Sequence, residues 1–340
     1  MVKTVGNNID ISIIIINYNT FELTCNCIKS IIKETKNINY ELIIVDNKST
    51  KDDPNLFLKE FPEVKLIISP KNLGFAGGNN LGLELAKSKY VLLLNSDTVI
   101  LNDAIYKTWH YLEKSSADVG VLGCKLLNPD GSLQPSTGEK TRGGYSIKKL
   151  IYKELTNNPI YFHLDKRFKT DENKNLSQTD QQEVYETNLV VGAYMLVRKE
   201  VFEKAGLLDE DFFMYNEELE WCNRIVRAGF KILFYPFAEI IHIGKQSSSN
   251  INMSRQIYLS QALFYFKVLG YRGYFMYILI NFFNLITNVL FYPFLSKNSQ
   301  FGVGQYIKKF GGSLYQMLSI IVHYQKKTSS GKVPLKSSDL

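Results

Sequence analysis

A polar cluster with one carboxylate, Asn95-Ser96-Asp97, follows the four apolar residues Val91 to Leu94. Such a run is typical of a strand that is buried on both faces, as in parallel sheets. Ligands in open α/β sheets bind just beyond the carboxyl ends of the strands. A carboxylate at this place suits a hard divalent cation held against a diphosphate, because Mg²⁺ prefers oxygen ligands. The alternative is a turn in which Asp97 only caps the next helix, and this cluster alone does not decide.

Glu217, Glu218 and Glu220 form a second cluster of carboxylates in the sequence. Three acidic side chains close together should raise the pKa of at least one of them, which suits a carboxylate that accepts a proton near neutral pH. The alternative is a helix whose first turn is acidic because carboxylates there complement the helix dipole. The residues alone leave both interpretations open.

Alternating strands and helices are expected to position these clusters. Apolar runs predict buried strands at residues 11–16, 41–45, 64–68, 91–94, 188–197 and 231–235. Helical patterns begin after Thr20, as an N-cap, and cover residues 102–114, 198–205 and 217–228. This alternation predicts an α/β fold with a parallel, doubly wound sheet. Three strands end on Asn17, Asp46 and Asn95, so we expect their polar side chains to converge at one edge of the sheet.

The composition indicates a globular protein and limits its partners. The 340 residues are 45% hydrophobic and 21% charged, with a net charge of +7. A basic surface suits nucleic acid, anionic lipid or a phosphorylated substrate. Helix-turn-helix, zinc-finger and RNA-recognition patterns are absent from the sequence, so we expect no nucleic-acid partner. The four cysteines match neither a zinc pattern nor a disulfide framework, and residues 1–10 lack a signal-peptide core, so we expect a reduced, cytoplasmic catalytic domain.

The first composition change along the chain lies at residues 137–182, which are rich in Lys, Asn, Asp and Gln. This segment predicts a long loop or flexible insertion within a catalytic domain that spans residues 1–250.

The remaining residues, 251–340, are expected to form a helical, membrane-associating region. Residues 274–295 contain no charged side chain and are long enough to span a bilayer. Asn281, Asn284 and Asn288 are spaced to share one helical face, which fits a membrane helix that packs on a partner or one that lies in the interface. A buried globular helix is the alternative. The lysines that follow suit the cytoplasmic face of the cell membrane.

Six segments in order resemble glycosyltransferase family 2, which has the GT-A fold, and in particular its bacterial rhamnosyltransferase-like members. The segments are Ile13 to Asn19, Ile44 to Ser49, Asn72 to Asn79, Leu93 to Asp97, Gly192 to Arg198 and Leu208 to Cys222. The resemblance implies a Rossmann-like, mostly parallel sheet flanked by helices. It also implies inverting transfer of a sugar from a nucleotide diphosphate donor with Mg²⁺ or Mn²⁺. The acceptor would be a glycan or a lipid-linked glycan in cell-surface polysaccharide synthesis at the inner-membrane surface.

The resemblance also assigns chemical roles. Asp97 matches the second carboxylate of the family's metal-binding Asp-x-Asp motif, with Asn95 where the first would stand. His242 matches a histidine that completes the metal site in some members, although a packed core histidine is the alternative. Glu218 matches the catalytic base, which takes the proton from the acceptor hydroxyl, and Glu217 is the alternative base.

Other roles implied by the resemblance concern the substrates. Glu220 and Trp221 are expected to shape the acceptor pocket. Asp46 is expected to bond the nucleoside, with the simpler alternative of a turn residue. The nucleotide-sugar-binding set comprises Asn17, Asp46, Asn72, Gly74, Asn79 and Asn95.

Several alternatives stay open. The donor is expected to be dTDP-rhamnose, or else a UDP-hexose or UDP-galactofuranose. A non-catalytic scaffold that binds a glycan or a partner, and a nucleotidyltransferase, are the competing classes. A Rossmann oxidoreductase is disfavoured because G-x-G-x-x-G should follow the first strand, where Asn17-Tyr18-Asn19 stands instead. The oligomeric state is undecided, with a homo-oligomer as one alternative.

Overall fold

The computed structural model describes residues 9–138, 148, 151, 182–244 and 253–290, and the chain divides into two compact units. The first unit contains the described residues 9–138, 182–213 and 217–244. The second contains Met214–Asn216 and the long helix α10 (Met253–Leu290). The predicted insertion at 137–182 lies almost wholly outside the described residues, so its flexibility stays a prediction.

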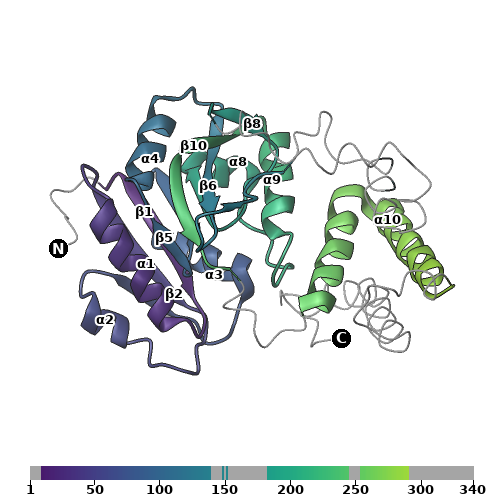
Figure 1. Cartoon of the computed structure of the whole chain (residues 1–340), viewed down its shortest axis with the longest axis horizontal. Coiled ribbons are helices and arrows are strands. Elements are labelled where there is room, and N and C mark those ends of the chain that lie inside the picture. Colours follow the sequence, from purple (N-terminus) through teal and green to yellow (C-terminus); the bar gives the residue numbers. More distant parts are fainter. Residues whose placement is uncertain (1–8, 139–147, 149–150, 152–181, 245–252, 291–340) are drawn as a thin grey trace. The chain divides into compact units, whose positions relative to one another are not determined.

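A single ten-stranded sheet organises the described part of the first unit, with the order β3-β2-β1-β4-β9-β6-β10-β5 and with β7 beside β6 and β8 beside β10 (Figure 1). The first four strands in this order are parallel, as predicted. Beyond them the sheet is mixed, because β9 runs antiparallel to both β4 and β6. The strands are β1 (Ile11–Asn17), β2 (Tyr40–Asp46), β3 (Lys65–Ile68), β4 (Tyr90–Asn95), β5 (Thr98–Ile100), β6 (Val119–Leu127), β7 (Leu133–Gln134), β8 (Tyr185–Thr187), β9 (Tyr194–Arg198) and β10 (Lys231–His242).

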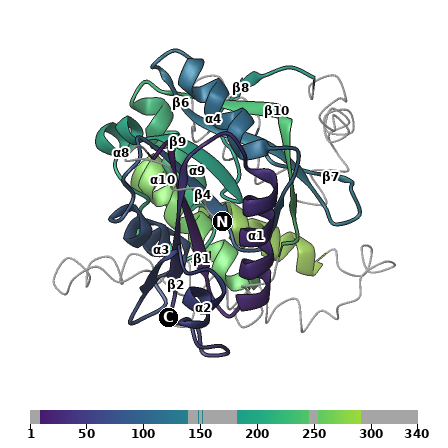
Figure 2. The same ribbon diagram turned by 90° about the vertical axis from the view of Figure 1, so that its left-hand side faces the viewer.

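Helices cover both faces of this sheet. Buried residues of α1 (Phe21–Glu34) and α4 (Ala104–Lys114) join one apolar cluster, and those of α3 (Gly74–Leu83), α8 (Lys199–Ala205) and α9 (Glu217–Arg227) join another. Figure 2 shows α1 and α3 on opposite sides of the strands. Because successive strand residues point to opposite faces, Ile13 joins the first cluster and Ile14 the second. The continuous apolar runs of the sequence are explained by this burial on both faces. A short helix, α2 (Leu56–Glu60), precedes β3.

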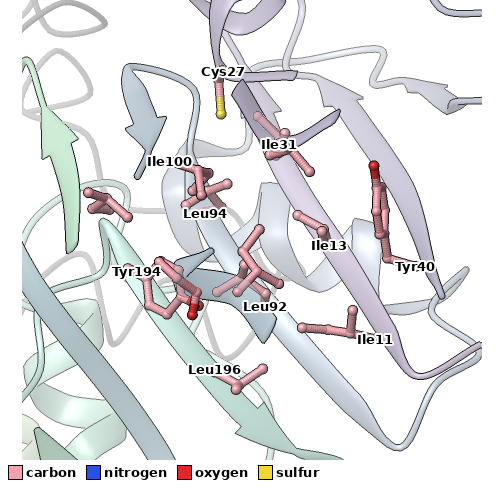
Figure 3. Close-up of a cluster of buried hydrophobic side chains, with 14 of the residues drawn as sticks. Ile11, Ile13, Cys27, Ile31, Tyr40, Leu92, Leu94, Ile100, Tyr194 and Leu196 are labelled. Atoms are coloured by element: carbon pink, nitrogen blue, oxygen red, sulfur yellow. The ribbon is translucent and has the colours of Figure 1, made fainter. Parts of the chain in front are cut away.

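Figure 3 shows the first cluster, in which Leu92 of β4 lies between Ile13 of β1 and Leu196 of β9. The Tyr194 hydroxyl, although fully enclosed, shares a hydrogen bond with the Thr108 hydroxyl of α4 (O···O 2.6 Å). A buried polar group therefore has its partner, and the bond ties α4 to the sheet.

Three strand predictions differ from the structure. β6 was not predicted, because Gly120 and Gly123 weaken the apolar pattern; a Cβ at Gly123 would lie 2.5 Å from Val190 Cγ1, so close packing requires the glycine. Of the predicted strand 188–197, only β9 from Tyr194 is observed; residues 188–193 lie between it and β8, which was not predicted. The predicted strand 231–235 extends to His242 through Pro236, where the pairing with β6 is irregular and no ladder bond is lost.

The second unit is dominated by α10, which is broken at Gly270 (φ 65°). Within the part of the chain that the structure describes, no helix has the length and apolar character needed to cross a membrane. Asn281 and Asn284 are buried, as expected for one shared face, whereas the side chain of Asn288 and residues 291–295 lie outside the described set.

Candidate active site

Strand register brings the predicted polar residues to one edge of the sheet. In the parallel pair β1–β2, Asn17 lies opposite Asp46, and in β1–β4, Ile16 lies opposite Asn95. The chain then turns back into β5, which pairs with β10 so that Thr98 lies opposite His242. The expected convergence of polar strand ends is therefore confirmed.

Asn17 and Asp46 form a buried hydrogen-bonded pair. Asn17 Nδ2 donates to Asp46 Oδ2 (2.7 Å) and to Ser49 Oγ (3.0 Å), and the Ser49 backbone N–H donates to Asp46 Oδ1 (2.9 Å). The hydroxyls of Thr20 and Thr24 donate to Asn17 Oδ1. The network satisfies the buried Asp46 carboxylate and holds the loop after β2 in place. Direct bonding of Asp46 to a nucleoside stays a prediction.

The glycine-rich loop is fastened to the same edge by Asn47, a residue that our sequence analysis did not single out. Asn47 Nδ2 donates to the Gly74 carbonyl (2.9 Å), and the Leu73 N–H donates to Asn47 Oδ1 (2.9 Å). The Gly74 N–H in turn donates to Asn72 Oδ1 (2.9 Å). Gly74 adopts φ 73°, and a Cβ there would lie 2.0 Å from the Phe213 carbonyl oxygen. Only glycine fits this turn.

Asn79 is placed differently from what its predicted role suggests. Its side chain is buried, and its Nδ2 donates to the Phe75 carbonyl of the same helix (3.0 Å). The next residue, Asn80, joins α3 to the segment before α9 through its bonds to Leu208 (N–H to Oδ1, 3.2 Å; Nδ2 to carbonyl, 2.9 Å). These asparagines stabilise the glycine-rich helix, and a donor contact by Asn79 stays a prediction.

Asp97 and His242, the two predicted metal ligands, lie together. Asp97 Oδ1 is 3.4 Å from His242 Nε2, and their side chains are 8% and 14% exposed. Asn95 Nδ2 lies 3.3 Å from the same ring nitrogen. The histidine is therefore not an isolated core residue, because it faces a carboxylate and an amide at the strand edge.

Gln134 fixes the tautomer of His242. The Gln134 Nε2 donates to Asn128 Oδ1 (3.0 Å) and to the His242 carbonyl (3.3 Å), which orients its amide so that Oε1 faces His242 Nδ1 at 2.6 Å. Since Oε1 can only accept, Nδ1 carries the proton, and the neutral ring keeps a lone pair on Nε2. A side-chain acceptor behind the second ring nitrogen is typical of a metal-binding histidine. Gln134 carries no motif, and the sequence offered no signal for its role.

One carboxylate oxygen and one imidazole nitrogen fit a divalent ion that takes its other ligands from a substrate diphosphate and water. Within the described ranges, no group of three or more His, Cys, Asp or Glu side chains could hold a metal ion. The residues therefore suit an ion that binds together with its nucleotide rather than one held by the protein alone.

Glu217 and Glu218 begin α9 with unsatisfied carboxylate oxygens. Within the described residues, Oε2 of each is buried and has no hydrogen-bond partner. Burial raises the pKa of Glu217 well above its usual value, and the neighbouring Glu218 charge raises it further. Burial also raises the pKa of Glu218. Both shifts favour a carboxylate that can take up a proton near neutral pH.

Glu218 lies beside a short turn that leads to the metal-ligand edge. A Cβ built on Gly192 would be 3.9 Å from Glu218 Cβ and 3.1 Å from Phe75 Cζ, so all three residues meet there. The next residue, Ala193, accepts a hydrogen bond from the Asn95 N–H (3.2 Å). One two-residue turn thus connects the carboxylate of α9 with the Asn95–Asp97 loop.

Glu220 and Trp221 lie behind these carboxylates. Glu220 accepts two hydrogen bonds from Arg224 Nε (2.8 and 2.9 Å). Trp221 is fully buried, stacks on Phe202 and donates to the Gly206 carbonyl (2.8 Å). Both residues anchor α9 in the core, and the predicted contact with an acceptor is untested.

Comparisons with known proteins agree with this geometry. The model of the family described as "Glycosyl transferase family 2" matches residues 12–206. The chain is 28% identical to the low-salt glycan biosynthesis hexosyltransferase Agl10 of Haloferax volcanii over 74% of this chain and 72% of that protein. It is 24% identical to the dTDP-rhamnosyl transferase RfbF of Shigella flexneri over 71% of each. The structure of the mannosyltransferase PcManGT from Pyrobaculum calidifontis, in complex with GDP-Man and Mn²⁺, matches with a TM-score of 0.51 at 13% identity, covering 95% of this chain and 88% of that one. This last likeness shows the fold.

Proposed function

The chain belongs to glycosyltransferase family 2 and is a glycosyltransferase of GT-A fold, and we propose that it transfers rhamnose with inversion from a dTDP donor to a glycan or lipid-linked acceptor. The observation that carries the proposal is the turn at Gly192 and Ala193. On one side it contacts Glu218, and on the other it bonds to the loop that leads to Asp97. This arrangement supports a base at Glu218 and a diphosphate bound near Asp97, which a single displacement requires to lie next to each other.

Asp97 and His242 would hold a divalent ion on the donor diphosphate. Bound there, Mn²⁺ or Mg²⁺ supplies Lewis-acid stabilisation of the negative charge that develops on the leaving diphosphate. Asp97 contributes a carboxylate oxygen, and His242 contributes Nε2, the ring nitrogen that remains available when Gln134 Oε1 accepts from Nδ1–H. The Asn95 side-chain amide can donate a hydrogen bond to an oxygen of the nucleotide-sugar donor. A carboxylate at this position would instead add a second negative charge beside Asp97.

Glu218 is the proposed base. It is less buried than Glu217, which is only 4% exposed, and it borders the Gly192 turn, so an acceptor hydroxyl can reach it more readily. As the hydroxyl oxygen attacks the anomeric carbon, its proton passes to the Glu218 carboxylate and the bond to the diphosphate breaks. One displacement of this kind inverts the anomeric configuration. Burial raises the pKa of Glu218, and Glu217, whose pKa is raised by burial and by the Glu218 charge, is the alternative base.

The nucleotide is proposed to bind over the ends of β1, β2 and the glycine-rich loop. The Asn17–Asp46 pair and Asn47 set the floor of this region, and Gly74 lets the backbone come close. The likeness to RfbF favours a dTDP sugar, and a UDP-hexose or UDP-galactofuranose is the alternative donor.

The acceptor is proposed to be presented at the cytoplasmic, inner-membrane surface during cell-surface polysaccharide synthesis. The basic C-terminal sequence supports this location, because lysines near an anionic leaflet are attracted to it.

A transfer assay tests the proposal. The enzyme is incubated with Mn²⁺, an undecaprenyl-diphosphate-linked acceptor panel and either dTDP-rhamnose, UDP-glucose, UDP-galactose or UDP-galactofuranose, and the nucleoside diphosphate and the product anomer are measured. We expect inverted product with dTDP-rhamnose, a fall in kcat of about 10²–10⁴-fold in Glu218→Gln, and full activity in the surface control Asp130→Asn. Equal turnover by Glu218→Gln would remove Glu218 as the base. Absence of transfer from every donor would favour the non-catalytic scaffold.

A further inference from the structure

The second half of α10 exposes a continuous apolar face. Seven large apolar side chains on it are between 42% and 66% exposed, and we refer to them as the outer stripe: Tyr271, Phe275, Leu279, Phe282, Phe283, Ile286 and Leu290. At 3.6 residues per turn these positions fall within a sector of about 120°. The stripe is therefore one face of the helix rather than scattered surface residues.

The opposite face of this half is buried, and on it three polar side chains lie among the apolar Tyr274, Tyr277, Ile278 and Ile280. Asn281, Asn284 and Thr287 are 7–8% exposed. Asn281 Nδ2 donates to the Tyr277 carbonyl (2.9 Å), and the Tyr277 hydroxyl donates to Gln261 Oε1 on the first half of α10 (2.9 Å). A surface helix in water places its apolar residues inward and its polar residues outward. Here seven large apolar side chains form a contiguous outward face instead, which indicates that the outer stripe faces an apolar environment.

The charge of the sequence identifies the kind of environment. After Glu239 the chain contains eleven Lys or Arg residues and a single acidic residue, Asp339. Arg272, at the start of the stripe, is itself exposed. An apolar face with only basic residues around it in sequence complements an anionic bilayer, since lipid acyl chains accept the apolar side chains and headgroups attract the cations. A second copy of this basic segment would offer no negative charge, and a protein partner would have to offer both an apolar groove and an acidic rim.

We propose that the outer stripe lies in the boundary between headgroups and acyl chains of an anionic membrane, with the second half of α10 parallel to the membrane plane. A stripe on one face is what an interfacial helix requires, whereas a spanning helix would be apolar all round. The proposal rests on the proposed function only in that a lipid-linked acceptor would be delivered at the same surface.

Vesicle binding by the full chain tests this proposal. Flotation is measured with phosphatidylcholine vesicles with and without about 30% phosphatidylglycerol, a fraction that makes the surface clearly anionic. We expect binding to the anionic vesicles and at least about a tenfold weaker partition for Leu279→Glu, because a charge in the stripe opposes burial. Leu58→Glu, at an equally apolar and 41% exposed position on α2, is the matched control and should bind like the natural chain. Equal binding by Leu279→Glu, or equal binding to neutral vesicles, would overturn the proposal.

A second variant covers the case in which Leu279→Glu fails to fold. Phe282→Trp places a fluorophore in the stripe with little change in polarity, and its emission should shift to the blue when anionic vesicles are added and be quenched by brominated lipid. A blue-shifted emission without vesicles would mean that another part of the chain, or a second copy, covers the stripe, and would contradict the proposal. Metal-dependent dTDP binding by Leu279→Glu separates the two proposals: lost vesicle binding with retained nucleotide binding leaves the proposed function intact.

Discussion

Gln134 is the residue that most directly controls the chemistry of the predicted metal-ligand pair. Its Oε1 accepts a hydrogen bond from the His242 Nδ1–H, and its Nε2 donates to two acceptors. These bonds fix the orientation of the Gln134 amide without a metal. Asp97 was predicted because it follows a strand end within one of the six segments, and His242 because it matches a histidine that completes the metal site in some family members. Gln134 was not, because it lies on a two-residue strand that only the folded sheet brings beside His242.

Replacing Gln134 by Leu should weaken Mn²⁺ binding in the presence of dTDP by about 10–100-fold, the usual effect of losing an outer partner of a metal-binding histidine. Gln134→Glu keeps an acceptor for Nδ1–H and should retain most of the affinity. Both are measured by the loss of free Mn²⁺ signal in electron paramagnetic resonance. Unchanged affinity in Gln134→Leu would show that the tautomer does not depend on Gln134.

Glu217 should lower the stability of the protein at neutral pH. Its folded-state pKa is raised by burial and by Glu218, so its contribution is most favourable while it is protonated, at low pH, and is lost as the pH rises through the folded-state pKa. Glu217→Gln removes the ionisable group, so the stability no longer falls as the pH rises through this pKa. We expect Tm to rise by about 2–4 °C at pH 8, the shift that about 1 kcal/mol produces in a domain of this size. At pH 4, where the carboxyl is already neutral, Tm should be nearly unchanged. A variant that is less stable than the natural chain at pH 8 would refute this explanation.

At the scale of elements, the glycine-rich loop depends on a close backbone contact. Gly74 combines a left-handed φ of 73° with a Cβ position 2.0 Å from the Phe213 carbonyl, whereas Gly131 has φ 82° and open space around it. Gly74→Ala should therefore destabilise the fold or displace the loop, with loss of nucleotide binding. Gly131→Ala should cost only about 1–2 kcal/mol of backbone strain and leave nucleotide binding intact. Urea unfolding and dTDP titration of both variants measure this. Equal effects in the two would show that the Phe213 contact is unimportant.

The elements differ in how well the sequence predicted them. Strands β1, β2 and β4 were predictable because both of their faces are largely apolar and buried, which gives uninterrupted runs such as Leu92 to Leu94. β6 was not, because its glycines serve contacts with Val190 and Val201 that exist only in the folded state. The segment 188–193 resembles a strand in composition, yet only Val190 forms an isolated bridge, to Thr137. Tertiary packing, which local patterns do not encode, decides these cases.

At the scale of the whole molecule, the two units differ in composition as well as in fold. The family match covers residues 12–206, within the part that carries the sheet, and the positive charge of the chain is concentrated after residue 240. Asn281 and Asn284 were correctly predicted to share a face, but the sequence did not reveal that this face is buried, together with Tyr277, and that a separate apolar face is exposed. Periodicity identifies the faces of a helix, whereas their partners depend on the tertiary structure.

The central claim is that Asp97 and His242 hold a divalent ion against a nucleoside diphosphate. The most direct test is thermal stabilisation by dTDP, UDP and GDP, each with and without Mn²⁺, in the natural chain and in Asp97→Ala and His242→Ala. A ligand that binds only the folded state raises Tm by mass action. We predict that dTDP raises Tm only when Mn²⁺ is present, and that both variants keep their fold but lose the shift. A rise of the same size without metal, or in Asp97→Ala, would contradict the account.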